Sequence, residues 1–228
     1  MGNARLCRTG QRCRRAVGWL ACAPLLCGLG QGVRADDTDF ARMLQLSLRD
    51  RAGVTLAERL HQDALQQLCS DPAGPPAVDR LTSLQRAQAQ QVRLPADGRY
   101  LGNWQAGEAI AQNGRGLQFT DPVGREHGQR GNGGNCYACH QLSATEPAYG
   151  TLGPSLLGYG RTHPPTPDTL RLTWQHLFNP HSQHLCSTMP RFGAQGILDE
   201  QQLRDVMALL FDPASPVNQV PDPMPVAP

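Results

Sequence analysis

The stretch Cys136-Tyr137-Ala138-Cys139-His140 decides how the rest of the chain is interpreted. Two cysteines separated by two residues and followed directly by a histidine are the attachment signature of a c-type haem. Each thiol adds to one vinyl group of the porphyrin, and the histidine then meets the iron from the proximal side. Because the motif occurs once, the sequence predicts one covalently attached haem c.

The same cysteine pair could instead be half of a zinc site or a redox-active dithiol. A zinc site needs two more ligands at short spacing, and the other cysteines after residue 35 stand alone. A thioredoxin-like dithiol belongs at a strand-to-helix junction, whereas glycine-rich segments flank this motif. Both alternatives therefore lack the flanking sequence that they need.

The first 35 residues have the pattern of a cleavable export signal. A basic run over residues 5–15 precedes an apolar core over 16–29, and Val33-Arg34-Ala35 places small residues at −3 and −1 of a cleavage site. The apolar core is too short to span a bilayer. We therefore predict cleavage after Ala35 and a periplasmic protein without a membrane span.

Two other interpretations of this segment are weaker. Arg14-Arg15 could belong to a twin-arginine signal, but its surroundings match that signal poorly. Cys22 or Cys27 could accept a lipid, but neither has the small-residue context of a lipid-attachment site.

The charge balance changes once the signal is set aside. The first 35 residues hold six of the 21 basic residues and none of the 19 acidic ones, so the remainder carries 15 basic against 19 acidic residues. A mildly acidic chain gives no indication of binding to nucleic acid or to a membrane surface.

Four of the eight cysteines also belong to the first 35 residues. If the haem takes Cys136 and Cys139, only Cys69 and Cys186 remain, and in an oxidising periplasm they most simply form a disulfide. The alternative is that Cys186, three residues before Met189, binds iron as a thiolate.

Residues 36–94 are predicted to form an N-terminal helical extension. Apolar residues recur at helical spacing over 39–70 and over 78–92, with a Pro- and Gly-rich break between the two runs. The apolar stripes are narrow, so the helices either lie against the next domain or a partner, or form a solvated pair without a specific role.

Residues 95–214 are predicted to form an all-α, loop-rich domain with the class I cytochrome c fold. A short helix over 107–112 has small residues on one face, and a last helix begins after an aspartate N-cap at residue 199 and ends before Pro213. In that fold, the first helix is expected to cross the apolar last helix at close range, with its small residues facing the last helix. A loop-dominated segment separates them, and the Pro-rich tail 215–228 is predicted to be extended.

The distal ligand of the iron has to come from the segment after His140. Met189, followed by Pro190, is the leading candidate, because a thioether favours ferrous iron and raises the reduction potential. Bis-histidine ligation is also chemically sound, so four downstream histidines remain alternatives: His163, His176, His181 and His184.

Several segments in order resemble the SoxX cytochromes of bacterial sulfur oxidation. The most particular are Met189-Pro190-Arg191-Phe192-Gly193 and Ser215-Pro216-Val217-Asn218. Others that match are Pro95-Ala96-Asp97-Gly98, Gly114-Arg115-Gly116, the haem motif with its preceding Gly133-Gly134-Asn135, and Gly150-Thr151-Leu152-Gly153-Pro154-Ser155-Leu156. The resemblance covers roughly residues 95–218, and the extension matches more loosely.

The resemblance implies a monohaem subunit that pairs with a SoxA-type cytochrome. Such a complex joins thiosulfate oxidatively to a cysteine of the SoxYZ carrier, and this subunit would pass the electrons to a downstream cytochrome. Carried over by position, Cys136 and Cys139 would attach the haem, His140 would be the proximal ligand and Met189 the distal one. The chain shows no catalytic residue of its own near these motifs, so whether it counts as an enzyme depends on the complex.

Two other functions remain open. A free-standing soluble cytochrome c could carry electrons between unrelated partners. A haem-based sensor would need an open sixth position, and Met189-Pro190 argues against it.

Overall fold

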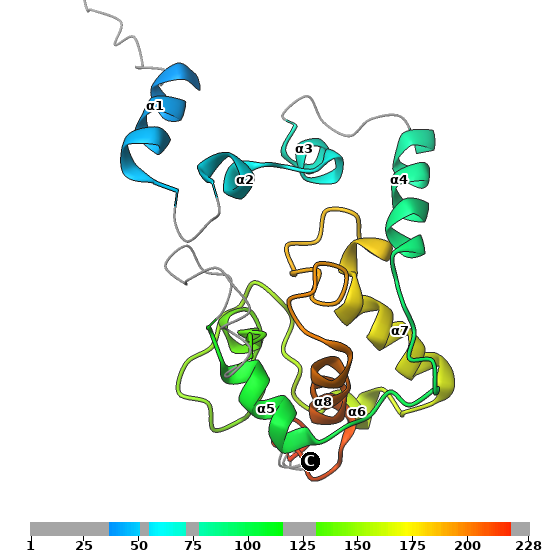
Figure 1. Cartoon of the computed structure of the whole chain (residues 1–228). Helices are drawn as coiled ribbons and strands as arrows, with labels where there is room; N and C mark the ends of the chain where they lie inside the picture. Colours follow the sequence, from blue (N-terminus) through cyan, green and yellow to red (C-terminus); the bar gives the residue numbers. More distant parts are fainter. Residues whose placement is uncertain (1–36, 51–54, 72–77, 116–130, 220–228) are drawn as a thin grey trace, which may run out of the picture. The chain divides into compact units, whose positions relative to one another are not determined.

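The computed structural model describes residues 37–50, 55–71, 78–115 and 131–219 (Figure 1). Within these ranges the chain forms helices and loops and no strand, as predicted for an all-α protein. None of the described helices is long and apolar enough to cross a membrane. The predicted export signal over 1–35 lies outside the described residues, as do residues 220–228 of the predicted tail.

The predicted helical run over 39–70 is wrong as a continuous element, because it consists of three helices: α1 (Asp37–Ser47), α2 (Leu56–Leu60) and α3 (Ala64–Ser70). Local caps restart the helix each time. Thr55 and Glu58 form a capping box at α2, and Asp63 and Gln66 form another at α3. Each box satisfies N–H groups at a helix start, which favours a new start over continuation.

The second helix of the extension, α4 (Val78–Gln90), agrees closely with the prediction. It packs against η3 (Pro180–Ser182). Its Gln88 is buried, and the Asn179 side-chain Nδ2 donates to Gln88 O at 3.1 Å and to Gln88 Oε1 at 3.0 Å. Of the two alternatives for the extension, packing against the following domain is therefore confirmed for α4.

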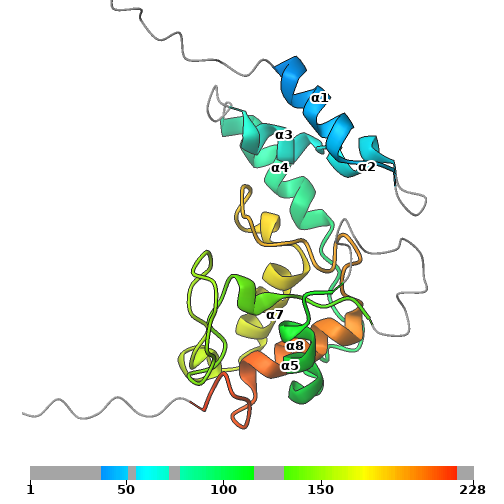
Figure 2. The ribbon, with the colours of Figure 1, turned by 90° about the vertical axis from the view of Figure 1, so that its left-hand side faces the viewer.

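The predicted crossing of a small-faced helix and an apolar last helix is confirmed. Helix α5 (Trp104–Gln112) packs on α8 (Glu200–Phe211), as Figure 2 shows. A Cβ atom at Gly107 would overlap the backbone carbonyl of Asp205, so only glycine permits this approach. Asp199 caps α8 in a capping box with Gln202, as expected.

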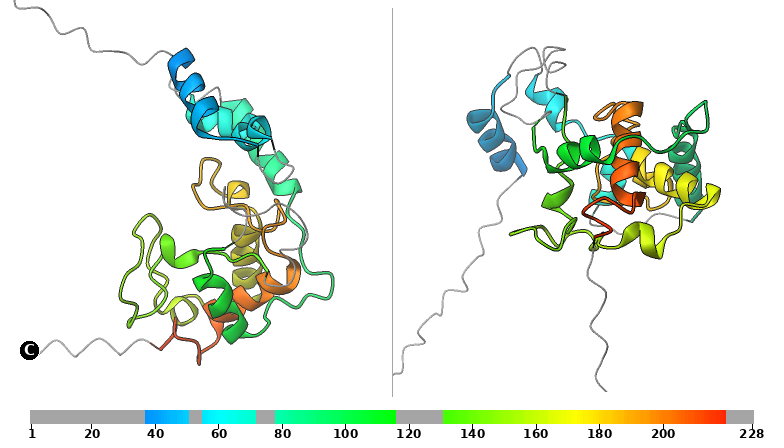
Figure 3. Two further views of the ribbon diagram at one scale, coloured as in Figure 1. Left: turned by 60° about the vertical axis from the view of Figure 1, so that its left-hand side comes forward. Right: turned by 90° about the horizontal axis from the view of Figure 1, so that it is seen from below.

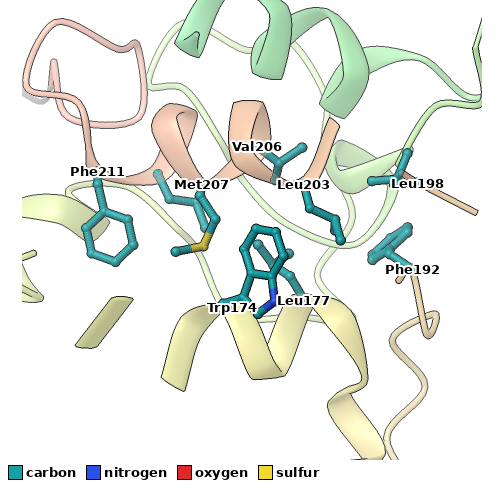
Figure 4. Close-up of a cluster of buried hydrophobic side chains, with 9 residues drawn as sticks. Trp174, Leu177, Phe192, Leu198, Leu203, Val206, Met207 and Phe211 are labelled. Atoms are coloured by element: carbon teal, nitrogen blue, oxygen red, sulfur yellow. The ribbon is translucent and has the colours of Figure 1, made fainter. Parts of the chain in front are cut away.

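The segment between these helices is less irregular than predicted. It contains α6 (Tyr159–Thr162) and the 12-residue α7 (Pro167–Phe178). Helix α8 lies between α5 and α7 (Figure 3, right). Trp174 of α7 is 1% exposed and packs with apolar residues of α8 in a cluster that we call the main core (Figure 4). The main core consists of the buried side chains of Trp174, Leu177, Phe192, Leu198, Leu203, Val206, Met207, Leu210 and Phe211. Side chains of α7, within the segment that was predicted to be dominated by loops, therefore form a packed apolar core with those of α8.

The extended tail was predicted to begin at residue 215, which is too early, because the first residues of this segment are packed. Ser215, Val217 and Asn218 are buried, and Ser215 Oγ donates to Leu209 O at 2.6 Å. The Asn218 Nδ2 donates to Leu210 O at 3.0 Å, which satisfies a carbonyl at the end of α8. The packed domain thus continues at least to Asn218, because these polar side chains close the last helix.

Candidate functional site

A single helical turn positions the two cysteines of the motif. The 3-10 helix η2 (Cys136–Ala138) follows Asn135, whose φ of 49° turns the chain through the left-handed region. The backbone N–H groups of Cys139 and His140 both donate to Cys136 O, at 3.1 and 2.9 Å. Both thiols are free, and both cysteines line one cavity of about 620 Å³. The turn therefore directs two unpaired thiols to the same space.

The pKa of the Cys136 thiol is raised, whereas that of a redox-active thiol is lowered. Burial raises its pKa to about 12, with a smaller contribution from Cys139, so the thiol stays protonated. Reactive dithiols depend on a lowered pKa. In the part of the chain that the structure describes, no three His, Cys, Asp or Glu side chains gather as a metal site either. Neither the dithiol nor the zinc alternative gains support.

The imidazole of His140 is fixed by its neighbours. Its Nδ1 lies 2.7 Å from Pro154 O, and because a carbonyl only accepts, Nδ1 carries the proton. The lone pair is then on Nε2, the tautomer needed for coordination through that atom. A Cβ at Gly153 would overlap the ring, so this glycine leaves the space that the imidazole occupies.

The structure brings Met189 to the same cavity as His140. Both residues line the 620 Å³ cavity and also an adjoining one of about 420 Å³. Met189 is half-buried against the main core, and its N–H donates to Ser187 Oγ at 3.2 Å. A thioether, an imidazole and two thiols thus converge from segments more than 40 residues apart.

The four alternative histidines are placed differently. His176 and His184 line the 620 Å³ cavity with their rings 5.7 Å apart, and burial lowers the pKa of His176. His163 lines only the smaller of these two cavities and stacks on Tyr159. His181 lines neither of these two cavities, and its Nε2 bonds to a backbone carbonyl. His176 and His184 therefore remain candidates for the distal position, whereas His163 and His181 are less well placed.

A disulfide joins the extension to the loop that carries Met189, residues 183–192, called here the Met189 loop. The expected pair, Cys69 of α3 and Cys186, is bonded, with 5.5 Å between the Cα atoms. A disulfide sulfur is no thiolate, so the alternative in which Cys186 binds iron is not supported. An ion pair of 2.6 Å between Arg191 and Asp63 links the same two segments.

The Asp63 carboxylate is stabilised in its charged form by this arrangement. Burial alone would raise its pKa. Hydrogen bonds from the N–H of Gln66 and from the Arg191 guanidinium lower the pKa by more than burial raises it, so the pKa lies below the ordinary value of 3.8. The guanidinium, whose side chain is 8% exposed, would be left buried without this partner.

The residues present fit a large, thiol-anchored cofactor with axial coordination. The cavity volume lies in the range of cofactor sites. Leu152, Pro154 and Phe192 contribute apolar walls, and Ser187 and Thr188, next to Met189, are among its polar lining residues. Pro154 and Gly153 were missed as functional residues by sequence reasoning, because their contact with His140 depends on a loop that returns after 14 residues.

No protein-family model matches this chain. It is 36% identical over 160 residues to an uncharacterized lipoprotein of Aquifex aeolicus (strain VF5), an alignment that covers 69% of this chain and 73% of the relative. The chain therefore belongs to the same family as this uncharacterized lipoprotein.

Proposed function

We propose that this protein is a periplasmic c-type cytochrome that carries one haem. Cys136 and Cys139 would attach the haem, His140 would hold the iron from one side and Met189 from the other. The observation that carries the proposal is the convergence of these four side chains on one cavity of about 620 Å³. The bound haem would supply a one-electron Fe(III)/Fe(II) couple.

The chain's own residues support this chemistry in three ways. The thiols of Cys136 and Cys139 would hold the porphyrin. Pro154 O orients the His140 ring through the Nδ1–H bond of 2.7 Å. Phe192, which is 4% exposed, borders the cavity and helps to exclude water from it.

We further propose that the protein is the electron-accepting subunit of a SoxAX-type complex. Its partners would be a SoxA-type cytochrome, the SoxYZ carrier through the complex, and a downstream cytochrome. The supporting observation is the extension: the Cys69–Cys186 disulfide and the Asp63–Arg191 ion pair hold it beside the Met189 loop. A free-standing electron carrier would not need this addition.

Export to the periplasm is part of the proposal. The Aquifex aeolicus relative is described as a lipoprotein, a class of protein that bacteria export, which supports export of this chain too. The basic run and apolar core of the first 35 residues point in the same direction.

The test is purification of the tagged protein from its native periplasm under oxidising conditions. We expect a second c-type cytochrome in stoichiometric amount, detected by haem staining and mass spectrometry. The matched control is the Cys136→Ser/Cys139→Ser variant, which should carry no covalent haem. A monomer that carries one haem but no partner would contradict the complex and favour the free-standing carrier.

A further inference from the structure

We propose that His181 is a positioning residue that holds Met189 in place as the distal ligand. The inference rests on the proposed function, because it concerns how the ligand loop is held at the haem site. His181 lines neither of the two cavities that His140 and Met189 share, so its role would be exerted through the loop and not by coordination.

The first step is the contact between His181 and the loop. His181 is 8% exposed, and its Nε2 lies 2.9 Å from Ser187 O. The carbonyl accepts, so Nε2 carries the proton. Ser187 Oγ in turn accepts the Met189 N–H at 3.2 Å. One residue, Ser187, is thus bonded to the imidazole through its carbonyl and to the ligand residue through its hydroxyl.

The second step is that His181 has a single proton to donate here. Burial lowers the pKa of His181 and so favours the neutral ring. The hydrogen bond to the Ser187 carbonyl opposes this effect but is smaller. Among the described residues Nδ1 has no hydrogen-bond partner. Within the described part of the chain, the ring therefore holds the loop through the hydrogen bond from Nε2 to Ser187 O.

The third step is that the other end of this chain of bonds is anchored in the extension. The His181 N–H donates to Asn179 Oδ1 at 3.2 Å, and the fully buried Asn179 donates from Nδ2 to Gln88 of α4. Bonds therefore run from Gln88 through Asn179, His181 and Ser187 to Met189. This connection is separate from the disulfide at Cys186 and gives α4 a role in holding the ligand.

Two amide substitutions separate this role from general packing. In His181→Gln the side-chain amide can reach the place of Nε2, whereas in His181→Asn it reaches only the place of Nδ1. We expect deuterium uptake by the peptide 185–192 of the haem-loaded protein to rise about fivefold in rate in His181→Asn and His181→Ala, the effect of one lost hydrogen bond. In His181→Gln it should stay within about twofold of the wild type.

The functional readout is cyanide binding to the ferric protein, which requires Met189 to leave the iron. It should accelerate by about the same factor in His181→Asn and not in His181→Gln. Gln195→Ala changes an exposed residue in the turn that follows the peptide 185–192; it is the control and should change neither measurement. If His181→Ala does not fold, the comparison of the two amide variants still decides.

Equal uptake and equal cyanide rates in all variants would overturn the inference. Faster uptake with an unchanged cyanide rate would also overturn it, because the loop would be held for a reason other than ligation. A wild-type chain without haem would refute the proposed function itself, and this outcome is recognised before any His181 variant is made.

Discussion

Removal of the disulfide by Cys69→Ser should lower the stability of the protein by several kcal/mol. The bond closes a loop with a sequence separation of 117 residues. On the loop-entropy model a loop of this length restricts the unfolded chain by about 5 kcal/mol, which is an upper figure because unfolded chains keep residual structure. For a chain of this size that corresponds to a fall in Tm of roughly 10–20 °C.

The assay is urea unfolding followed by far-UV circular dichroism. Cys69→Ser should have a lower midpoint than the wild type, and the wild type should fall to the same midpoint when a dithiol reductant is added. Cys69→Ser/Cys186→Ser is the matched control, because it removes the free thiol that the single variant leaves. A wild type in which Cys69 and Cys186 are free thiols under oxidising conditions, or whose midpoint does not change with reductant, would refute the reasoning.

Three further predictions concern the site and its support. Met189→Ala should lower the reduction potential and open the ferric iron to cyanide, since a thioether favours ferrous iron; an unchanged potential would make His176 or His184 the better candidate. Gly153→Ala should reduce the yield of haem-loaded protein several-fold, because its Cβ would overlap the ring of the proximal histidine; an unchanged yield by haem absorbance would contradict this. Asp63→Asn should cost stability by a constant amount above about pH 5, and the difference from the wild type should shrink as the pH falls through 3.8 towards the lower folded-state pKa, because the pKa of Asp63 is lowered in the folded state. A difference that grows towards acid pH in thermal unfolding would show that the sign is wrong.

The parts of the fold that were predictable are those fixed by local chemistry. The aspartate N-cap at Asp199 is visible in the sequence and places the start of α8 correctly. The small residues of 107–112 predict α5 and its end, but the helix begins three residues earlier, at Trp104. Helix α7 was missed because a proline-rich run precedes it. Pro167 is compatible with a helix start, and the cap from Thr166 was the available signal.

Other features depend on contacts between distant segments. Prolines in 215–228 suggested an extended tail, but Ser215 and Asn218 bond to carbonyls at the end of α8, which only the folded chain brings within reach. The bond from His140 to Pro154 and the bond from His181 to Ser187 are of the same kind. The turn at Cys136–His140 could be predicted without the fold, because the spacing of its cysteines already specifies one turn.

The most direct test of the central claim is the haem content of the purified protein. The chain is produced with the cytochrome c maturation machinery, denatured, extracted with acidified acetone and assayed as the pyridine haemochrome. We predict one haem per chain that stays with the polypeptide through extraction, and none in Cys136→Ser/Cys139→Ser. A wild-type chain without haem, or one whose haem is removed by the extraction, would contradict the account.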